Sequence, residues 1–398
     1  MFVRGHKKLP KCSPVRILLL SLVIMLSICG CSESKDQQQI PDAGSKPDSI
    51  LSSTGEPKSS EQFDSALVEA LSKLVDSASF SGVVTVTSKD GKVFSRSYGY
   101  SNFGEGIRNS DSTFFQIASL TKIFTAIGVY DLAKKGKLKY TDPLTKHLKS
   151  RLPYNNVQIK HLLNHTSGIP DYFSLAEKYF KGAAGPNNRE IFGLYSTNSV
   201  KLKFTPGSNF EYSNINYIIL SSIIEDVSGI SFERYLRDSI SFIPDRAPVY
   251  SKNELKDSAK QVALAYASTG KKYQIVSAGA TRILDNRKGS GGLYFRAGQL
   301  HQWLCRLFFK NGYYSGILLD VGLNKSLDSR NYIFGFYKGK IAGNEYLYCY
   351  GKNPGMNSFC AYLPKQEIII TISGNHEFNS QNTGEKFVST IISAKKKQ

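Results

Sequence analysis

Residues 116–124 read Gln116-Ile117-Ala118-Ser119-Leu120-Thr121-Lys122-Ile123-Phe124 and begin an apolar run typical of a helix buried on most sides. Ser119 on the first turn and Lys122 three residues later share one helix face, so the hydroxyl and the ammonium lie close together. A serine hydroxyl becomes a useful nucleophile beside a base or a cation. The helix N-terminus adds partial positive charge where an oxyanion would form. Taken alone, the segment fits a helix-capping serine with an exposed lysine equally well.

The Ser-x-x-Lys pattern occurs three more times, beginning at Ser32, Ser268 and Ser393. Those copies lie in polar or terminal stretches without an apolar helix behind them. The position of Ser119 in front of a buried helix therefore distinguishes it from the other three.

The composition indicates a folded, basic protein. The chain has 398 residues, of which 41% are hydrophobic, and this supports a sizeable core in one large domain or two ordinary ones. The net charge of +19 favours contact with anionic envelope polymers or lipid headgroups. Nucleic acid is not an expected partner, because the chain lacks zinc-finger spacing, RNA-binding sheet motifs and a basic helix.

The first thirty residues resemble an export signal, with a basic beginning and an apolar run at 17–26 that is too short for a comfortable membrane span. Ile28-Cys29-Gly30-Cys31-Ser32 then resembles a bacterial lipobox, with Cys31 as the lipid-bearing residue. We expect a signal peptide at 1–30 and a lipidated Cys31 with a flexible polar tether at 31–61. The protein would be lipid-anchored in the bacterial cell envelope. An uncleaved anchor or an ordinary secretory signal is the alternative.

Residues 62–398 are expected to form one α+β domain, with an antiparallel sheet flanked by helices and a mainly helical lobe inserted at about 138–290. Strand patterns occur at both ends of this region and helical patterns in its middle. A first hairpin at 80–100 should therefore join the last strands in one sheet. Those last strands are predicted at 332–337, 346–351, 358–363 and 367–373.

Two further patterns are interpreted as structural. His161 and His165 have the spacing of a metal site, but no Glu lies between them and no third ligand is evident. The glycine-rich segment 289–295 does not match a dinucleotide-binding fingerprint, and we expect it to lead into a helix. No metal and no organic cofactor is therefore predicted.

The ordered landmarks resemble the serine β-lactamase and penicillin-binding-protein superfamily, and most of all the class C β-lactamase-related serine hydrolases. The resemblance covers residues 62–395. It rests on Ser119-Leu120-Thr121-Lys122 as Ser-x-x-Lys and on Tyr212-Ser213-Asn214 as Tyr-x-Asn. The segments 161–168 and 291–294 match two further family segments. The resemblance implies a β-lactamase/transpeptidase-like fold.

The same resemblance implies acyl-enzyme chemistry on an amide, a lactam or an ester. Ser119 would attack the carbonyl carbon, and Lys122 and Tyr212 would relay its proton, with Tyr212 as the expected base and later the acid. Asn214 would orient the lysine and the substrate amide. The backbone N–H groups of Ser119 and Lys352 would hold the oxyanion.

The chain departs from the family at the third motif, which usually has Lys or His, then any residue, then Gly. Gly351 and the turn at 354–355 align, but Cys349 occupies the cationic position. A neutral thiol cannot bind a substrate carboxylate, and strand alternation sends the Lys352 side chain to the other face. Cys349 and Cys360 would face each other in a simple hairpin. A disulfide between them is one hypothesis, and two free buried thiols are the preferred interpretation.

We therefore expect an envelope serine hydrolase with D-alanyl-peptidase or β-lactamase-type activity. Its substrate would be a small molecule or a peptide of cell-wall peptidoglycan. The alternatives are a class C-like β-lactamase proper, a small-ester esterase, and a catalytically impaired protein that binds wall fragments. The departure at Cys349 is the main support for the last alternative.

Overall fold

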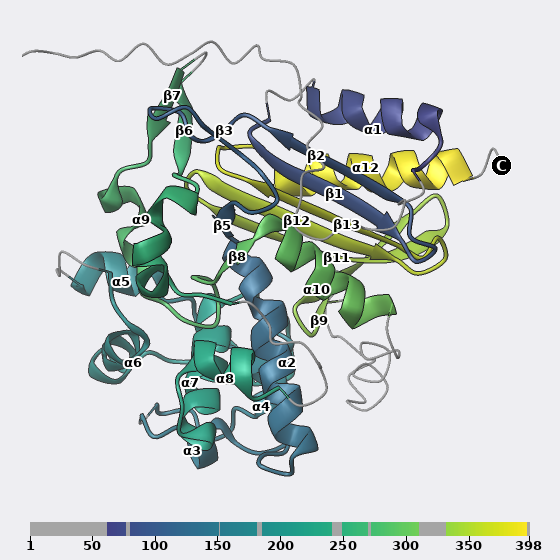
Figure 1. Ribbon diagram of the computed structural model, residues 1–398. Helices are drawn as coiled ribbons and strands as arrows, with labels where there is room; N and C mark the ends of the chain where they lie inside the picture. The colour runs from purple at the N-terminus through teal and green to yellow at the C-terminus, as the bar shows by residue number, and fades with distance from the viewer. Residues whose placement is uncertain are drawn as a thin grey trace, which may run out of the picture. The chain divides into compact units, whose positions relative to one another are not determined.

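The computed structural model contains one large antiparallel sheet to which both ends of the folded region contribute (Figure 1). It describes residues 62–76, 80–150, 152–180, 185–240, 249–269, 272–309 and 332–395. The predicted signal peptide, Cys31 and the tether lie outside the described residues, so they stay predictions.

The seven strands follow the order β2-β1-β13-β12-β11-β10-β9, and every neighbouring pair is antiparallel. The N-terminal hairpin pairs with the last strand, as predicted, because β1 runs beside β13 from the Gly82–Gly374 pair onward. The α+β fold expected from the sequence is confirmed. The strands are β1 (Gly82–Ser88), β2 (Val93–Tyr98), β9 (Tyr332–Ile333), β10 (Phe336–Ile341), β11 (Asn344–Asn353), β12 (Met356–Leu363) and β13 (Ile368–Gly374).

Helices cover both faces of this sheet, which explains why its central strands are rich in buried β-branched residues. Helices α1 (Ser65–Asp76) and α12 (Ser380–Lys395) lie on one face, and α10 (Ala297–Phe309) lies on the other (Figure 1). Alternate residues of β1 divide between the two layers. Val84 packs with the α1 and α12 side, whereas Val83 packs with the α10 side.

The helix after Ser119 is α2 (Thr121–Lys134), and its residues from Thr121 to Leu132 are all buried. A helix that is apolar on every side belongs inside a core. It packs on α7 (Asn214–Ser228), where a Cβ atom at Gly128 would lie 2.8 Å from the Ile224 side chain. The other helices of this part are α3 (Leu144–His147), α4 (Ile159–Leu163), α5 (Phe173–Tyr179), α6 (Asn188–Thr197), α8 (Phe232–Asp238) and α9 (Ala278–Asp285).

Two local expectations need correction. Ser119 does not lie inside the long helix but in a 3₁₀ turn, η1 (Ala118–Leu120), just before it. The glycine-rich segment leads first into a short strand, β8 (Tyr294–Arg296), which pairs with β5 (Phe114–Gln116). This pairing places the residues before Ser119 beside the glycine-rich segment.

The lobe predicted at about 138–290 is not wholly helical. It contains a short hairpin of β6 (Tyr266–Thr269) and β7 (Lys272–Ile275), where Tyr266 bridges to His376 at the end of the main sheet. The remaining short elements are β3 (Tyr100–Asn102), β4 (Ile107–Arg108) and η2 (Lys252–Gln261). Within the described ranges, no single helix is long and apolar enough to cross a membrane. Helices α7 and α8 reach that length and apolar content only together, and they are bent by 70° to each other.

Candidate active site

The turn that carries Ser119 packs against strands β11 and β12. The Ser358 hydroxyl donates to the Ile117 carbonyl at 2.8 Å. Gly351 on β11 allows the close approach, since a Cβ atom there would lie 2.7 Å from that same carbonyl. Ala118 has a φ of 45°, a left-handed conformation that costs about 1–2 kcal/mol for a residue with a Cβ atom. The surrounding contacts therefore hold a strained backbone immediately before Ser119.

Lys122 is fully buried, and its Nζ atom has three hydrogen-bond partners. Nζ lies 3.2 Å from Ser119 Oγ, 2.9 Å from Asn214 Oδ1 and 2.7 Å from the Ser290 carbonyl. Burial, and next the charge of Arg287, lowers the pKa of Lys122 well below its usual value. A neutral amine has two N–H donors and one lone pair. Asn214 and Ser290 can accept both N–H bonds, which leaves the lone pair for the Ser119 hydroxyl.

Tyr212 approaches Ser119 from the other side, with its hydroxyl 3.1 Å from Ser119 Oγ. Burial raises the pKa of Tyr212 well above its usual value, although the hydrogen bond with Ser119 opposes this. Its ring lies against that of His165, with centroids 4.3 Å apart. The expected assignment of Tyr212 as the base is not supported, because burial disfavours the phenolate and favours the neutral amine. Sequence spacing alone does not reveal burial.

Asn214 is fixed by a carboxylate that the sequence analysis missed. Asp171 Oδ2 accepts from the Asn214 backbone N–H at 3.1 Å and from its side-chain Nδ2 at 2.8 Å. The second bond decides which way the Asn214 amide points, so that its oxygen faces Lys122. A signal was present in the sequence, because Asp171 lies only three residues after the segment 161–168 that matches the family. Its partner could not be identified without the fold.

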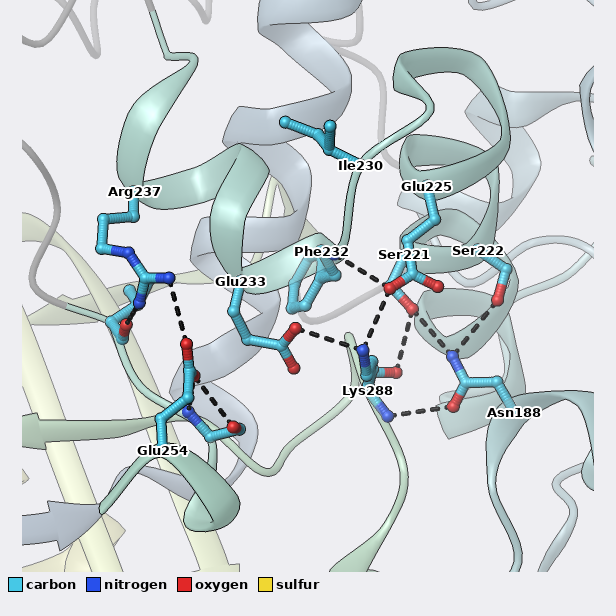
Figure 2. A network of polar contacts seen from close by, with 12 residues as sticks. Asn188, Ser221, Ser222, Glu225, Ile230, Phe232, Glu233, Arg237, Glu254 and Lys288 are labelled. Carbon is cyan, nitrogen blue, oxygen red and sulfur yellow. Dashed lines mark hydrogen bonds and ion pairs between the residues drawn. The ribbon is translucent and has the colours of Figure 1, made fainter. Parts of the chain in front are cut away.

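The segment that holds the Ser290 carbonyl, residues 287–290, is anchored at every residue and is called the strap below. The Thr125 hydroxyl donates to the Gly289 carbonyl at 2.7 Å. Figure 2 shows the anchoring of Lys288, whose Nζ lies 3.1 Å from carboxylate oxygens of both Glu225 and Glu233. Its backbone N–H donates to Asn188 Oδ1 at 2.9 Å. The sequence analysis considered only residues 289–295 of this region and expected them to lead into a helix.

Gly289, within the strap, has no room for a side chain of its own. This residue has a φ of 86°, and a Cβ atom would lie 2.2 Å from the Tyr217 carbonyl. The Ser221 hydroxyl also donates to the Lys288 carbonyl at 3.0 Å. The strap therefore rests directly on α7, the same helix whose first residue is Asn214.

Cys349 occupies the third-motif position and lies beside the turn that carries Ser119. It is buried, and its thiol lies 3.9 Å from the Ser119 carbonyl oxygen. Burial raises the pKa of the Cys349 thiol to about 12, so it supplies no charge and is not a reactive thiolate. Cys349 pairs directly with Cys360 across the hairpin, and both are free thiols, so the disulfide hypothesis is not supported.

A cavity of about 560 Å³ opens above Ser119. Tyr212 and Asn214 line it beside the serine, and Lys352 lies on its wall with an exposed side chain. The remaining lining residues are Phe173, Glu177, Ala280, Ile283, Leu284, Arg287, Tyr337, Tyr350 and Asn353. The cavity therefore combines the nucleophile with an aromatic and aliphatic wall and with cationic groups.

Each of the two histidines binds the backbone of a neighbouring segment. The ring of His161 accepts from the Gln158 backbone N–H at 3.2 Å and completes the capping box of α4. His165 Nδ1 accepts from the Ser213 backbone N–H at 3.2 Å. His165 thus fixes the chain between Tyr212 and Asn214.

Known proteins resemble the chain in both sequence and fold. Penicillin-binding protein 4* of Bacillus subtilis (strain 168) is 34% identical over 165 residues, which are 42% of this chain and 36% of that protein. The match thus spans about a third of that relative's length. A solved penicillin-binding protein from Bacillus halodurans has a TM-score of 0.66 at 25% identity, over 81% of this chain and 98% of that one.

The D-amino acid amidase of Ochrobactrum anthropi SV3, solved with D-phenylalanine, shares the fold. The two structures have a TM-score of 0.69 at 19% sequence identity, and the match covers 84% of this chain and 100% of the amidase. The Beta-lactamase family matches residues 67–388. The chain therefore belongs to the beta-lactamase family, a family of serine hydrolases whose sequence landmarks converge here on Ser119.

Proposed function

We propose that this protein is an envelope serine hydrolase that acts through an acyl-enzyme on D-alanyl amides, with Ser119 as the nucleophile. One observation carries the proposal. Ser119 Oγ lies between Lys122 Nζ at 3.2 Å and Tyr212 Oη at 3.1 Å, at the floor of an open cavity. A nucleophile with a base on one side and a proton donor on the other is the arrangement that acyl transfer requires.

The proton transfers balance as follows. Lys122, as a neutral amine, takes the Ser119 proton while Oγ bonds to the substrate carbonyl carbon. The backbone N–H groups of Ser119 and Lys352 hold the oxyanion. The C–N bond breaks as Tyr212 donates its hydroxyl proton to the leaving nitrogen, and the Lys122 ammonium returns a proton to Tyr212. Water then releases the acyl group from Ser119 by the reverse transfers.

Three features support a cell-wall peptide as the substrate. The names of the relatives include a penicillin-binding protein and a D-amino acid amidase, which fit amides of D-amino acids. The chain has a net charge of +19 and stays basic without the predicted signal peptide, which carries five basic residues and no acid, and this favours anionic wall polymers. The predicted lipid on Cys31 would hold the domain at a membrane surface beside such polymers. Cell-envelope location and the lipid anchor are part of this proposal.

A β-lactamase proper is the second candidate, favoured by the family match. Such turnover needs efficient release of the acyl group, and in this chain the third-motif cation is replaced by neutral Cys349. We therefore propose acylation by β-lactams with slow release.

Intact-protein mass spectrometry after incubation with a penicillin tests this proposal. We expect a stable adduct on the native protein and none on Ser119→Ala, whereas the matched variant Ser112→Ala, which changes an exposed serine, keeps the adduct. Hydrolysed drug without an adduct would instead assign a β-lactamase. The absence of both would contradict the proposal and favour an esterase or a wall-fragment binder, which a general serine-reactive probe separates.

A further inference from the structure

Arg287 is a buried cation without an ion-pair partner among the described residues. Arg287 is 4% exposed, yet it lines the cavity above Ser119. It donates to Tyr172 Oη at 3.2 Å and to Asn353 Oδ1 at 3.1 Å, and both acceptors are neutral oxygens. Its Nε atom is buried and has no hydrogen-bond partner.

Burying the Arg287 charge in this way costs free energy unless an anion binds to the guanidinium. Placing an unpaired charge in a protein interior is strongly unfavourable, and a guanidinium cannot escape by losing its proton. The neighbouring buried cation, Lys122, does have that escape. The nearby carboxylate of Asp171 is already bound by Asn214 and makes no ion pair with Arg287 within the described part of the chain.

The position of Arg287 is also fixed. Arg287 is the first residue of the strap, whose Ser290 carbonyl binds Lys122. Gly291 leaves space for the guanidinium, since a Cβ atom at Gly291 would lie 2.6 Å from a terminal nitrogen of Arg287. Through Asn353 it reaches the end of β11, next to Lys352. A planar fork held in this way is suited to bind a carboxylate.

We propose that Arg287, with Lys352 beside it on the cavity wall, binds the free carboxylate of the substrate and so replaces the cation that the third-motif position lacks. The proposal rests on the proposed function for the reaction, and it adds the substrate class: acyl compounds whose leaving group is an amino acid with a free carboxylate. Amides and esters without this charge would bind more weakly. Glu177 at the exposed side of the cavity disfavours an anion there and leaves the Arg287 end as the site.

A binding experiment in the Ser119→Ala background tests this without any turnover. The probes are N-acetyl-D-alanyl-D-alanine and its C-terminal carboxamide, measured by isothermal titration calorimetry. We expect the carboxylate to bind on the order of 100-fold more tightly, as for a desolvated charge pair. The double variant Ser119→Ala/Arg287→Gln should bind both probes equally. Ser119→Ala/Arg234→Gln, which removes an exposed arginine on α8, should keep the preference.

Arg287→Lys is the second variant, which retains the charge without the fork, and we expect a preference reduced to about tenfold. The proposal is overturned by a preference that survives Arg287→Gln, by equal binding of the two probes before Arg287 is changed, or by no detectable carboxylate binding at millimolar concentration. Because these measurements need no nucleophile, they are separate from the penicillin test. A carboxylate preference without a Ser119 adduct would refute the proposed function and leave the anion site standing.

Discussion

Replacing Asp171 by asparagine should slow acylation of Ser119 by about 10- to 150-fold. Asp171 accepts two hydrogen bonds from Asn214, and the amide of an asparagine could still accept one of them. The change therefore removes about one hydrogen bond to a charged group, worth roughly 1.5–3 kcal/mol, and about 1.4 kcal/mol corresponds to tenfold in rate. Losing this hydrogen bond should slow the reaction, because Asn214 would no longer be fixed with its oxygen toward Lys122.

The same change has an electrostatic consequence with a defined sign. The Asp171 carboxylate raises the pKa of Lys122, so its removal lowers that pKa further. Because the neutral amine is the active form, the acid limb of the rate profile should move to lower pH even as the maximum rate falls. A purely structural role of Asp171 would lower the rate without this movement.

The assay is the second-order rate of labelling of Ser119 by a fluorophosphonate probe between pH 5 and pH 9, which needs no knowledge of the substrate. The matched control is Asp226→Asn, the same chemical change on a carboxylate that also accepts a backbone N–H, from Lys149 at 2.8 Å, but near the other end of α7. Labelling within threefold of the native rate, with an unmoved acid limb, would refute the reasoning about Asp171.

Three further outcomes are expected. Gly289→Ala should lower the free energy of unfolding by about 2–5 kcal/mol in a denaturant titration, because the added Cβ atom would overlap the Tyr217 carbonyl. The control Gly193→Ala, where the added atom would meet open space, should instead stabilise the protein by about 0.5–1 kcal/mol. The rate of acylation should rise with pH through an acid limb set by the lowered pKa of Lys122 and show no alkaline loss near pH 10, since the pKa of Tyr212 is raised. An alkaline limb near pH 10 would contradict the raised pKa of Tyr212, and a rate that keeps rising up to pH 10 would contradict the assignment of Lys122 as base. The thiols of Cys349 and Cys360 should stay unreactive toward a thiol reagent until the protein is denatured, because both are buried with raised pKa values, and rapid native labelling of either would disprove this.

The sheet could be predicted from sequence because its signals are local. The β-branched runs at 82–88 and 368–374 indicate strands by themselves, and strands at both ends of the chain point to one shared sheet. The short hairpin at 266–275 could not be found, because its residues are mostly polar and contacts with distant segments hold it, among them the bridge from Tyr266 to His376 and the packing of Phe103 on Tyr273. A contact of that kind depends on the finished fold.

The site residues that belong to sequence motifs could be predicted, whereas the roles that depend on burial could not. Ser-x-x-Lys and Tyr-x-Asn identified Ser119, Lys122, Tyr212 and Asn214, which the structure brings together. The preferred base could not be read from spacing, since it depends on the desolvation of Lys122 and Tyr212. Asp171 reaches the site through hydrogen bonds to a residue 43 positions away in sequence.

The replacement of the third-motif cation by Cys349 and the presence of Arg287 are best understood together. A cation beside Lys122 has two effects: it binds an anionic substrate group, and it lowers the pKa of the lysine. Cys349 can do neither, because its thiol is neutral. In this structure Arg287 has the second of these effects, because its charge lowers the pKa of Lys122 more than any other influence except burial. If the charge has moved from β11 to the strap, then Cys349→Lys would place a second cation near Lys122 and should lower its pKa further, and Arg287→Gln should raise it. Opposite movements of the acid limb in these two variants would show that one electrostatic role is shared between two positions, and movement in only one of them would refute it.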